Sequence, residues 1–219
     1  MLSELLLYRF SGWLLTAVWL FLSFQALRRR GVWNGRYRYF LIFLLSISFI
    51  ELAAAITAPL LSNNLFLDYP YITIEFVMLG LFLAKIIDIG FITRLVNVAS
   101  ALFVLFQIAN AFWLQGLESY NSYGEYVNNA YLFMLSVWAL TVLYRQNLGR
   151  SILAVRDAWF VLGILGIYLL ISVIDFLYDM ALPYRNDHIL YIVLISGNFL
   201  KSGLLMLYYK GIRMMPRQR

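Results

Sequence analysis

Seven long apolar stretches alternate with short polar segments along this chain of 219 residues. Each stretch has about the 20 residues that an α-helix needs to cross the hydrocarbon core of a bilayer. Turn and stop residues separate the stretches, such as the basic run Arg28–Gly31 after the first and a few polar residues around Asp88 between the third and fourth. The pattern predicts seven transmembrane helices, over Leu5–Leu27, Tyr37–Leu61, Pro70–Gly90, Thr93–Leu114, Tyr126–Tyr144, Ala158–Leu182 and Ile189–Tyr209.

The composition agrees with this pattern. Hydrophobic residues make up 63% of the chain and charged residues 13%, and the mean hydropathy is +0.79. A soluble domain averages about 25% charged residues, so an ordinary soluble fold is excluded. The absence of cysteine excludes a disulfide framework and a thiol nucleophile. We expect an all-α membrane protein with a single seven-helix domain over residues 1–219 and no soluble domain.

Basic residues gather on one side of the predicted bundle. The positive-inside rule places that side in the cytoplasm, which puts the N-terminus outside and the C-terminus inside. The net charge of +6 then reflects contact with anionic lipid headgroups, and no nucleic-acid partner is predicted. Fourteen of the 17 basic residues belong to this side: Arg28, Arg29, Arg30, Arg36, Arg38, Lys85, Arg94, Arg145, Arg150, Arg156, Lys210, Arg213, Arg217 and Arg219.

Several polar and ionisable residues fall inside the predicted spans. A charged side chain facing lipid costs about 2.5–3.5 kcal/mol even on the mildest scale, so each needs a partner or a role. The helical rise places four of them about 10–15 Å below the outer surface and Lys201 roughly 20 Å below it. The predicted ligand-binding residues are Arg9, Glu51, Glu75, Asn110, Asp175, Asn198 and Lys201.

Two interpretations of these charges remain open. In the first, the acids pair with Arg9 and Lys201 and hold the helices together. In the second, they line a pocket that opens to the outside and binds a small polar or cationic ligand or a proton. The common depth of the charges favours the pocket, because structural ion pairs need no common layer.

Lys201 raises a further possibility. A lysine midway along a seventh helix is where rhodopsins bind retinal, and Glu75 on the third helix fits the position of a counterion. Rhodopsins place an acid one helical turn before that lysine, however, and this chain has Gly197 there. We therefore expect no cofactor and retain a retinal pigment as the weakest alternative.

Other chemistry is easier to set aside. The single histidine, His188, has no neighbours with which to form a metal cluster, so no metal site is predicted. Without a histidine partner, no hydrolase triad can be assembled. We expect no catalytic residue and no enzymatic activity.

Three short motifs carry a resemblance to a known group of proteins. They are Asn63–Phe82 around the start of the third predicted helix, with Tyr69–Tyr71 leading into Ile74–Phe76, then Asp157–Phe160 at the start of the sixth and Asn198–Lys201 in the seventh. With them, the chain resembles small seven-helix membrane proteins of Bacteroidota, which are similar to the membrane portions of sensor histidine kinases. The resemblance implies a sensor or receptor in the bacterial inner membrane, a signalling partner such as a histidine kinase, and roles for Glu75, Asn198 and Lys201.

The predicted function is therefore that of a receptor-like sensor that signals to a cytoplasmic or membrane partner in trans. A small transporter or channel is the alternative, favoured by a possible internal repeat. In that repeat, Glu51 and Pro59 are matched by Asp175 and Pro183 with the same spacing.

Overall fold

The computed structural model describes residues 2–29, 31, 34–57, 60, 64–181 and 187–216. These residues form seven long helices and no strand, which confirms the predicted all-α bundle. All seven helices are long and apolar enough to cross a membrane, so the chain is an integral membrane protein. The helices are α1 (Leu2–Leu27), α2 (Tyr37–Thr57), α3 (Asp68–Ile87), α4 (Gly90–Ala109), α5 (Ser122–Gln146), α6 (Arg156–Ala181) and α7 (Asp187–Arg213).

The turn between α3 and α4 is as short as the sequence predicted. Asp88 adopts a left-handed conformation with φ of 54°, and its backbone N–H donates to the carbonyl of Ala84 at 3.0 Å. Ile89 is extended, and Gly90 already begins α4. The third predicted span is therefore wrong at its end, since Gly90 belongs to the next helix.

Several helices are longer than their apolar stretches. α5 begins four residues before the predicted Tyr126, because the side chain of Asn121 accepts the backbone N–H of Gly124 at 3.1 Å and caps the helix. α4 continues into a π-helical turn over Asn110–Leu114. The two prolines of the possible repeat, Pro59 and Pro183, lie outside the described residues.

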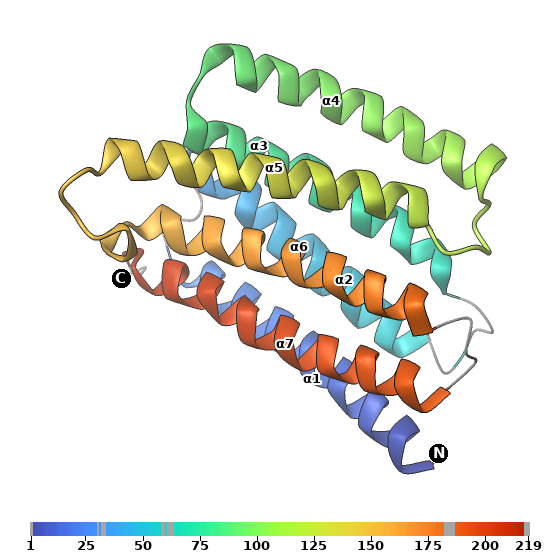
Figure 1. Ribbon diagram of the computed structural model, residues 1–219. Coiled ribbons are helices and arrows are strands. Elements are labelled where there is room, and N and C mark those ends of the chain that lie inside the picture. The colour runs from blue at the N-terminus through green and yellow to red at the C-terminus, as the bar shows by residue number, and fades with distance from the viewer. Residues whose placement is uncertain are drawn as a thin grey trace.

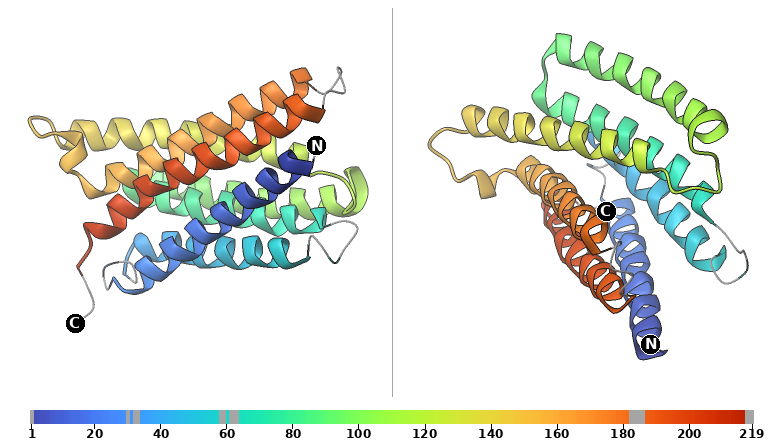
Figure 2. Two further views of the ribbon diagram at one scale, coloured as in Figure 1. Left: turned by 90° about the horizontal axis from the view of Figure 1, so that it is seen from below. Right: turned by 45° about the vertical axis from the view of Figure 1, so that its right-hand side comes forward.

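Six of the helices form a closed ring. Going round it, α1 packs on α2, α2 on α3, α3 on α5, α5 on α6, α6 on α7, and α7 returns to α1. α4 lies outside the ring against α3, at the top edge of the bundle in Figure 1 and apart from α1 and α7 in the right-hand view of Figure 2. α3 is therefore the helix with the most neighbours, and it has the largest buried share of the seven.

An aromatic cluster fills the ring at the end where α2 begins and α7 ends. Phe40 is at its centre, with ring centroids 4.6 Å from Phe160, 5.0 Å from Tyr208 and 5.3 Å from Phe82. These four side chains are at most 1% exposed. The cluster joins α2, α3, α6 and α7 and leaves that half of the bundle tightly packed.

Two glycines let α6 and α7 approach closely around this cluster. A Cβ atom on Gly163 would lie 2.5 Å from the ring of Tyr208, and one on Gly211 would lie 2.7 Å from the ring of Phe160. Small residues at helix contacts are typical of membrane bundles, because they let neighbouring backbones come close.

Candidate functional site

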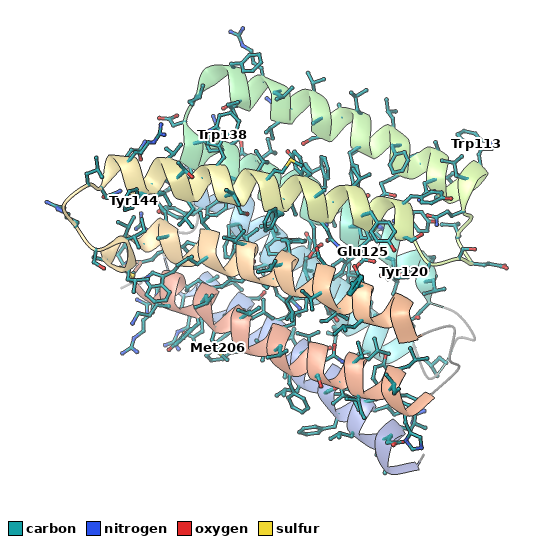
Figure 3. The ribbon with its side chains drawn as sticks, viewed as in Figure 1. Trp113, Tyr120, Glu125, Trp138, Tyr144 and Met206 are labelled. Atoms are coloured by element: carbon teal, nitrogen blue, oxygen red, sulfur yellow. The ribbon has the colours of Figure 1, made fainter. Side chains whose placement is uncertain are left out.

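A cavity of about 230 Å³ lies within the ring, in the half opposite the aromatic cluster. α2, α3, α5, α6 and α7 all contribute to its wall. Asn64, Leu67 and Tyr120 line it from the connections at the end of the bundle where the N-terminus lies. Figure 3 shows Tyr120 and Glu125 together at this end. The cavity is therefore associated with one end of the membrane-spanning bundle.

The cavity wall is acidic. Among the described residues that line it, four carry a carboxyl group and one carries an ammonium group. The acids come from three helices and the lysine from a fourth. A cavity with this balance favours a cationic occupant over a neutral or anionic one. The charged residues are Glu51, Asp68, Glu75, Glu125 and Lys201.

Glu75 is the most enclosed of these acids, with 4% of its surface exposed. Its carboxylate accepts a hydrogen bond from Nδ2 of Asn128 at 3.1 Å and also interacts with the hydroxyls of Tyr71 and Tyr168. These neutral partners fix the position of the carboxylate. They supply no positive charge, and the ammonium group of Lys201 attracts the carboxylate without forming an ion pair within 4.0 Å among the described residues.

Asn128 has an unused acceptor beside this carboxylate. The residue is 1% exposed, and its Oδ1 atom has no hydrogen-bond partner in the described part of the chain. A buried polar atom without a partner loses free energy relative to water. Because Asn128 lines the cavity, a ligand with N–H donors could satisfy this atom.

Lys201 is held by Tyr71. Its Nζ atom donates to the Tyr71 hydroxyl at 3.3 Å and lies 5.6 Å from the centre of the same ring. Tyr71 also interacts with Glu51 and Glu75. Within the described residues, Lys201 forms no ion pair within 4.0 Å of an acid. One expectation was that Lys201 would pair directly with an acid, and its hydrogen-bond partner is instead a tyrosine.

The structure brings together three of the seven predicted ligand-binding residues, namely Glu51, Glu75 and Lys201. Arg9 is exposed on α1 and lines a separate groove of about 370 Å³, on whose wall Glu51 also lies. Asp175 faces a third groove, between α5 and α6, and accepts a hydrogen bond from Asn129 at 3.5 Å.

The two predicted asparagines do not line the cavity. Asn198 donates to the hydroxyl of Ser11 at 3.1 Å and so links α7 to α1. Asn110 donates to Asn121 at 2.7 Å and to Gln115 at 2.9 Å, in an amide network that fixes the connection from α4 to α5. These hydrogen bonds indicate that both asparagines stabilise contacts between segments of the fold.

Sequence reasoning missed several residues of the cavity. Asp68 and Glu125 lie just before the predicted spans that begin at Pro70 and Tyr126, although each belongs to the first turn of a helix. A signal was available in the spacing of Asp68, Tyr71 and Glu75, which places them on one face of α3. The same reasoning applies to Glu125 with Asn128 and Asn129 on α5.

The carboxyl groups are distributed around the cavity. In the part of the chain that the structure describes, no three histidine, cysteine, aspartate or glutamate side chains converge so that they could hold a metal ion. The arrangement suits an occupant that meets the acids from several sides, such as an organic cation with N–H groups pointing in different directions.

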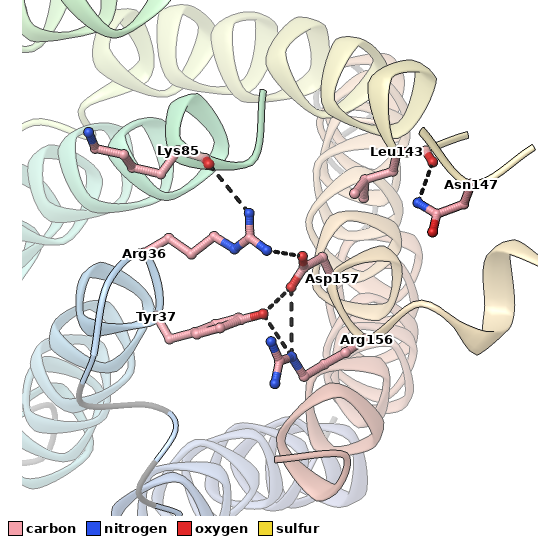
Figure 4. A network of polar contacts seen from close by, with 7 residues as sticks. All are labelled: Arg36, Tyr37, Lys85, Leu143, Asn147, Arg156 and Asp157. Carbon is pink, nitrogen blue, oxygen red and sulfur yellow. Dashed lines mark hydrogen bonds and ion pairs between the residues drawn. The ribbon is translucent and has the colours of Figure 1, made fainter. Parts of the chain in front are cut away.

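A second polar network lies at the other end of the bundle, next to the aromatic cluster (Figure 4). Asp157 at the start of α6 is 6% exposed and pairs with Arg36 at 2.5 Å. It also accepts a hydrogen bond from Tyr37, whose hydroxyl accepts one from Nε of Arg156 at 2.7 Å. A further bond of 3.5 Å from Arg36 to the carbonyl of Lys85 extends the network to α3.

Comparison of the chain with protein families, with curated proteins and with solved structures finds no match.

Proposed function

We propose that the chain is a receptor-like membrane sensor that binds a small organic cation in the acidic cavity and signals to a partner protein in trans. One observation carries this proposal: the described cavity wall has four carboxyl groups against a single ammonium group. A cation inside the cavity offsets the repulsion among these acids, which water does poorly in a low-dielectric site.

The volume limits the size of the ligand. Pockets for drug-sized molecules measure about 300–1,000 Å³. The cavity of about 230 Å³ is smaller than these, so we expect a ligand with few non-hydrogen atoms. Ammonium and guanidinium groups fit both the charge and the unused acceptor of Asn128.

The packing of the opposite half favours a sensor over an open channel. The aromatic cluster around Phe40 fills the ring below the cavity. α3 and α6 run from the cavity to the network of Arg36, Tyr37 and Asp157. A shift of these two helices at the cavity would therefore alter the surface around that network, which a partner protein could bind. A ligand can shift such packing only if it binds two arrangements with different affinity.

Orientation and location complete the proposal. We take the end of the bundle with Arg36 and Arg156 as cytoplasmic, because basic residues gather there and the positive-inside rule favours that side, and the cavity then faces outside. A bacterial inner membrane and a histidine-kinase-like partner follow from the resemblance described above, as parts of the same proposal.

A thermal-shift measurement on the purified protein tests ligand binding. We expect methylammonium or ammonium to raise the unfolding midpoint by roughly 5 °C at about 100 times Kd, relative to the same concentration of sodium. Glu75→Gln should abolish this rise. Glu118→Gln, in the exposed connection before α5, is the matched control and should retain it. The absence of any rise with both cations would contradict the proposal.

Transport remains the second candidate, because a cavity associated with one end of the bundle and closed at the other also suits one state of a transporter. Uptake of radiolabelled methylammonium into proteoliposomes distinguishes the two. A sensor binds the cation without accumulating it, whereas a transporter fills the vesicle.

A retinal pigment is favoured least. Tyr71 contacts the ammonium group of Lys201, and the surrounding wall is small and acidic, with no long apolar tunnel among its described residues. A visible absorption band that appears after addition of retinal and is absent in Lys201→Ala would favour the pigment over the sensor and the transporter.

A further inference from the structure

A groove of about 520 Å³ lies at the end of the bundle opposite the acidic cavity. Four segments that are distant in the sequence form its wall: the connection between α1 and α2, the end of α3 with the turn after it, the start of α6, and the stretch after α7. We name it the basic groove, because three of its described lining residues are cations and one is an acid. These charged residues are Arg36, Lys85, Asp88 and Arg156.

Tertiary contacts hold the wall of the basic groove together. Arg29 is 8% exposed and donates from Nη1 to the carbonyl of Met215 at 2.7 Å, which ties the stretch after α7 to the end of α1. In the same region, a Cβ atom on Gly31 would lie 3.3 Å from Cδ of Pro216, and both residues line the groove. The groove is therefore part of the fold, and Arg29 adds a further positive charge next to it.

Arg156 has unused hydrogen-bond donors at this groove. Its Nε atom donates to the hydroxyl of Tyr37 at 2.7 Å, and its guanidinium carbon lies 4.4 Å from the centre of the Tyr37 ring, so the group is held in place. Its two Nη atoms have no hydrogen-bond partner in the described part of the chain, and no contact reaches them in Figure 4. The side chain is 33% exposed. Two adjacent Nη atoms form the fork that binds an oxyanion through two hydrogen bonds.

Two further cations complete the donor set. Arg36 binds Asp157 through Nη2, while its Nη1 atom makes only the long contact of 3.5 Å with the carbonyl of Lys85. The side chain of Lys85 is exposed, and its flexible stem lets the ammonium group reach an anion in the groove. Two acids, Asp88 and Asp157, stand against four cations when Arg29 is included. The basic groove thus keeps an excess of positive charge.

We propose that the basic groove binds a phosphate group, with the Arg156 fork as its main ligand and Lys85 and Arg36 as further donors. A phosphate has several acceptor oxygens, which match donors that come from three separate parts of the fold. The volume is sufficient for a glycerophosphate group. The inference goes beyond the proposed function and is independent of it, because no described residue lines both the basic groove and the acidic cavity.

Two sources can supply this phosphate. The basic groove lies where the membrane-spanning helices end, so both lipid headgroups and the aqueous solution are near it. Titration calorimetry on the protein in detergent micelles distinguishes them with two probes, phosphatidylglycerol and glycerol 3-phosphate. Binding of phosphatidylglycerol alone assigns the site to a lipid headgroup, and similar binding of both probes assigns it to a soluble phosphate ester. Absence of saturable binding for both probes would overturn the inference.

Exposed charges of the groove give variants that test the site without disturbing the fold. Lys85→Gln removes one cation and should weaken binding about fivefold. Lys210→Gln makes the same substitution at an exposed position in the last turn of α7, outside the groove, and should leave the affinity unchanged. Asp88→Asn removes the acid and should strengthen binding by a similar factor, because asparagine tolerates the left-handed backbone at this position.

Arg156→Gln tests the main ligand directly. It removes the guanidinium fork and should weaken binding roughly tenfold, as loss of a charge-assisted hydrogen bond predicts. Because Arg156 also contacts Tyr37, the unfolding midpoint without any phosphate is measured beside it. Equal affinities in the wild type, Lys85→Gln and Asp88→Asn would overturn the inference, since those two variants change exposed side chains only.

Discussion

The buried carboxylates at the two ends of the bundle differ in how completely their charge is paired. At one end, Asp157 is enclosed by Arg36, Tyr37 and Arg156, so that its charge is balanced by hydrogen-bonded cations. At the other end, Glu75 is as deeply buried but has an amide and two hydroxyls as hydrogen-bond partners, and Lys201 attracts it without a direct ion pair among the described residues. Full pairing indicates a structural joint between helices. We interpret the incomplete pairing around the cavity as the cation-binding site of the proposed function.

Packing differs in the same way. The end with Asp157 adjoins the aromatic cluster, in which Phe40 contacts rings from three other helices. The end with Glu75 encloses a cavity. The tightly packed core and the acidic cavity thus lie at opposite ends of the bundle, and substitutions at the two ends should have different consequences.

The largest expected effect is at the aromatic cluster. Phe40→Ala removes a fully buried ring and leaves a void among α2, α3, α6 and α7. We expect a loss of about 3–5 kcal/mol in the free energy of unfolding, measured by unfolding in mixed micelles. Phe49→Ala, on the exposed face of α2, is the control and should change stability little. An equal loss in both variants would contradict the assignment of the core.

The next effect is at the paired carboxylate. Asp157→Asn leaves Arg36 and Arg156 facing each other without the charge that holds them. We expect a loss of about 2–3 kcal/mol, below the value for a fully buried pair because both arginine side chains are one-third exposed. A variant as stable as the wild type in mixed micelles would show that the network is not a joint.

A smaller effect is expected at Asn198. Its hydrogen bond to Ser11 joins α7 to α1, and such bonds in membrane bundles average about 0.6 kcal/mol. Asn198→Ala should therefore reduce stability by about that amount and leave the methylammonium response intact. Loss of the methylammonium response in this variant would indicate that Asn198 takes part in ligand binding after all.

The smallest effect on stability is expected at Glu75 itself. Glu75→Gln retains most hydrogen bonds and removes one of several neighbouring negative charges. We expect the free energy of unfolding to change by less than about 0.5 kcal/mol or to rise, while cation binding is lost. A loss as large as that of Asp157→Asn would mean that Glu75 is also a structural partner.

The sequence predicted the helices well because membrane spans depend on local composition. Helix ends were less accurate, since caps such as Asn121 and the left-handed Asp88 act through backbone geometry that an apolar run does not show. The predicted orientation, with the N-terminus outside, stays a prediction.

The sequence predicted how deep the site residues lie in the membrane, but not which way each helix turns its side chains. The helical rise predicts that Glu51 and Glu75 share a layer with Lys201 just beneath it, and the three line one cavity. Asp175 has a similar predicted depth but points between α5 and α6, because helix rotation within a ring depends on contacts far apart in the sequence. Tyr71 went unnoticed, since its position between Lys201 and two acids is a tertiary property.

Direct equilibrium binding of radiolabelled methylammonium to the purified protein tests the central claim, that the acidic cavity holds a small cation. The account predicts saturable binding to the wild type that guanidinium displaces, that Glu75→Gln removes and that Asp157→Asn leaves in place. Binding that does not saturate, or that survives Glu75→Gln unchanged, would contradict it.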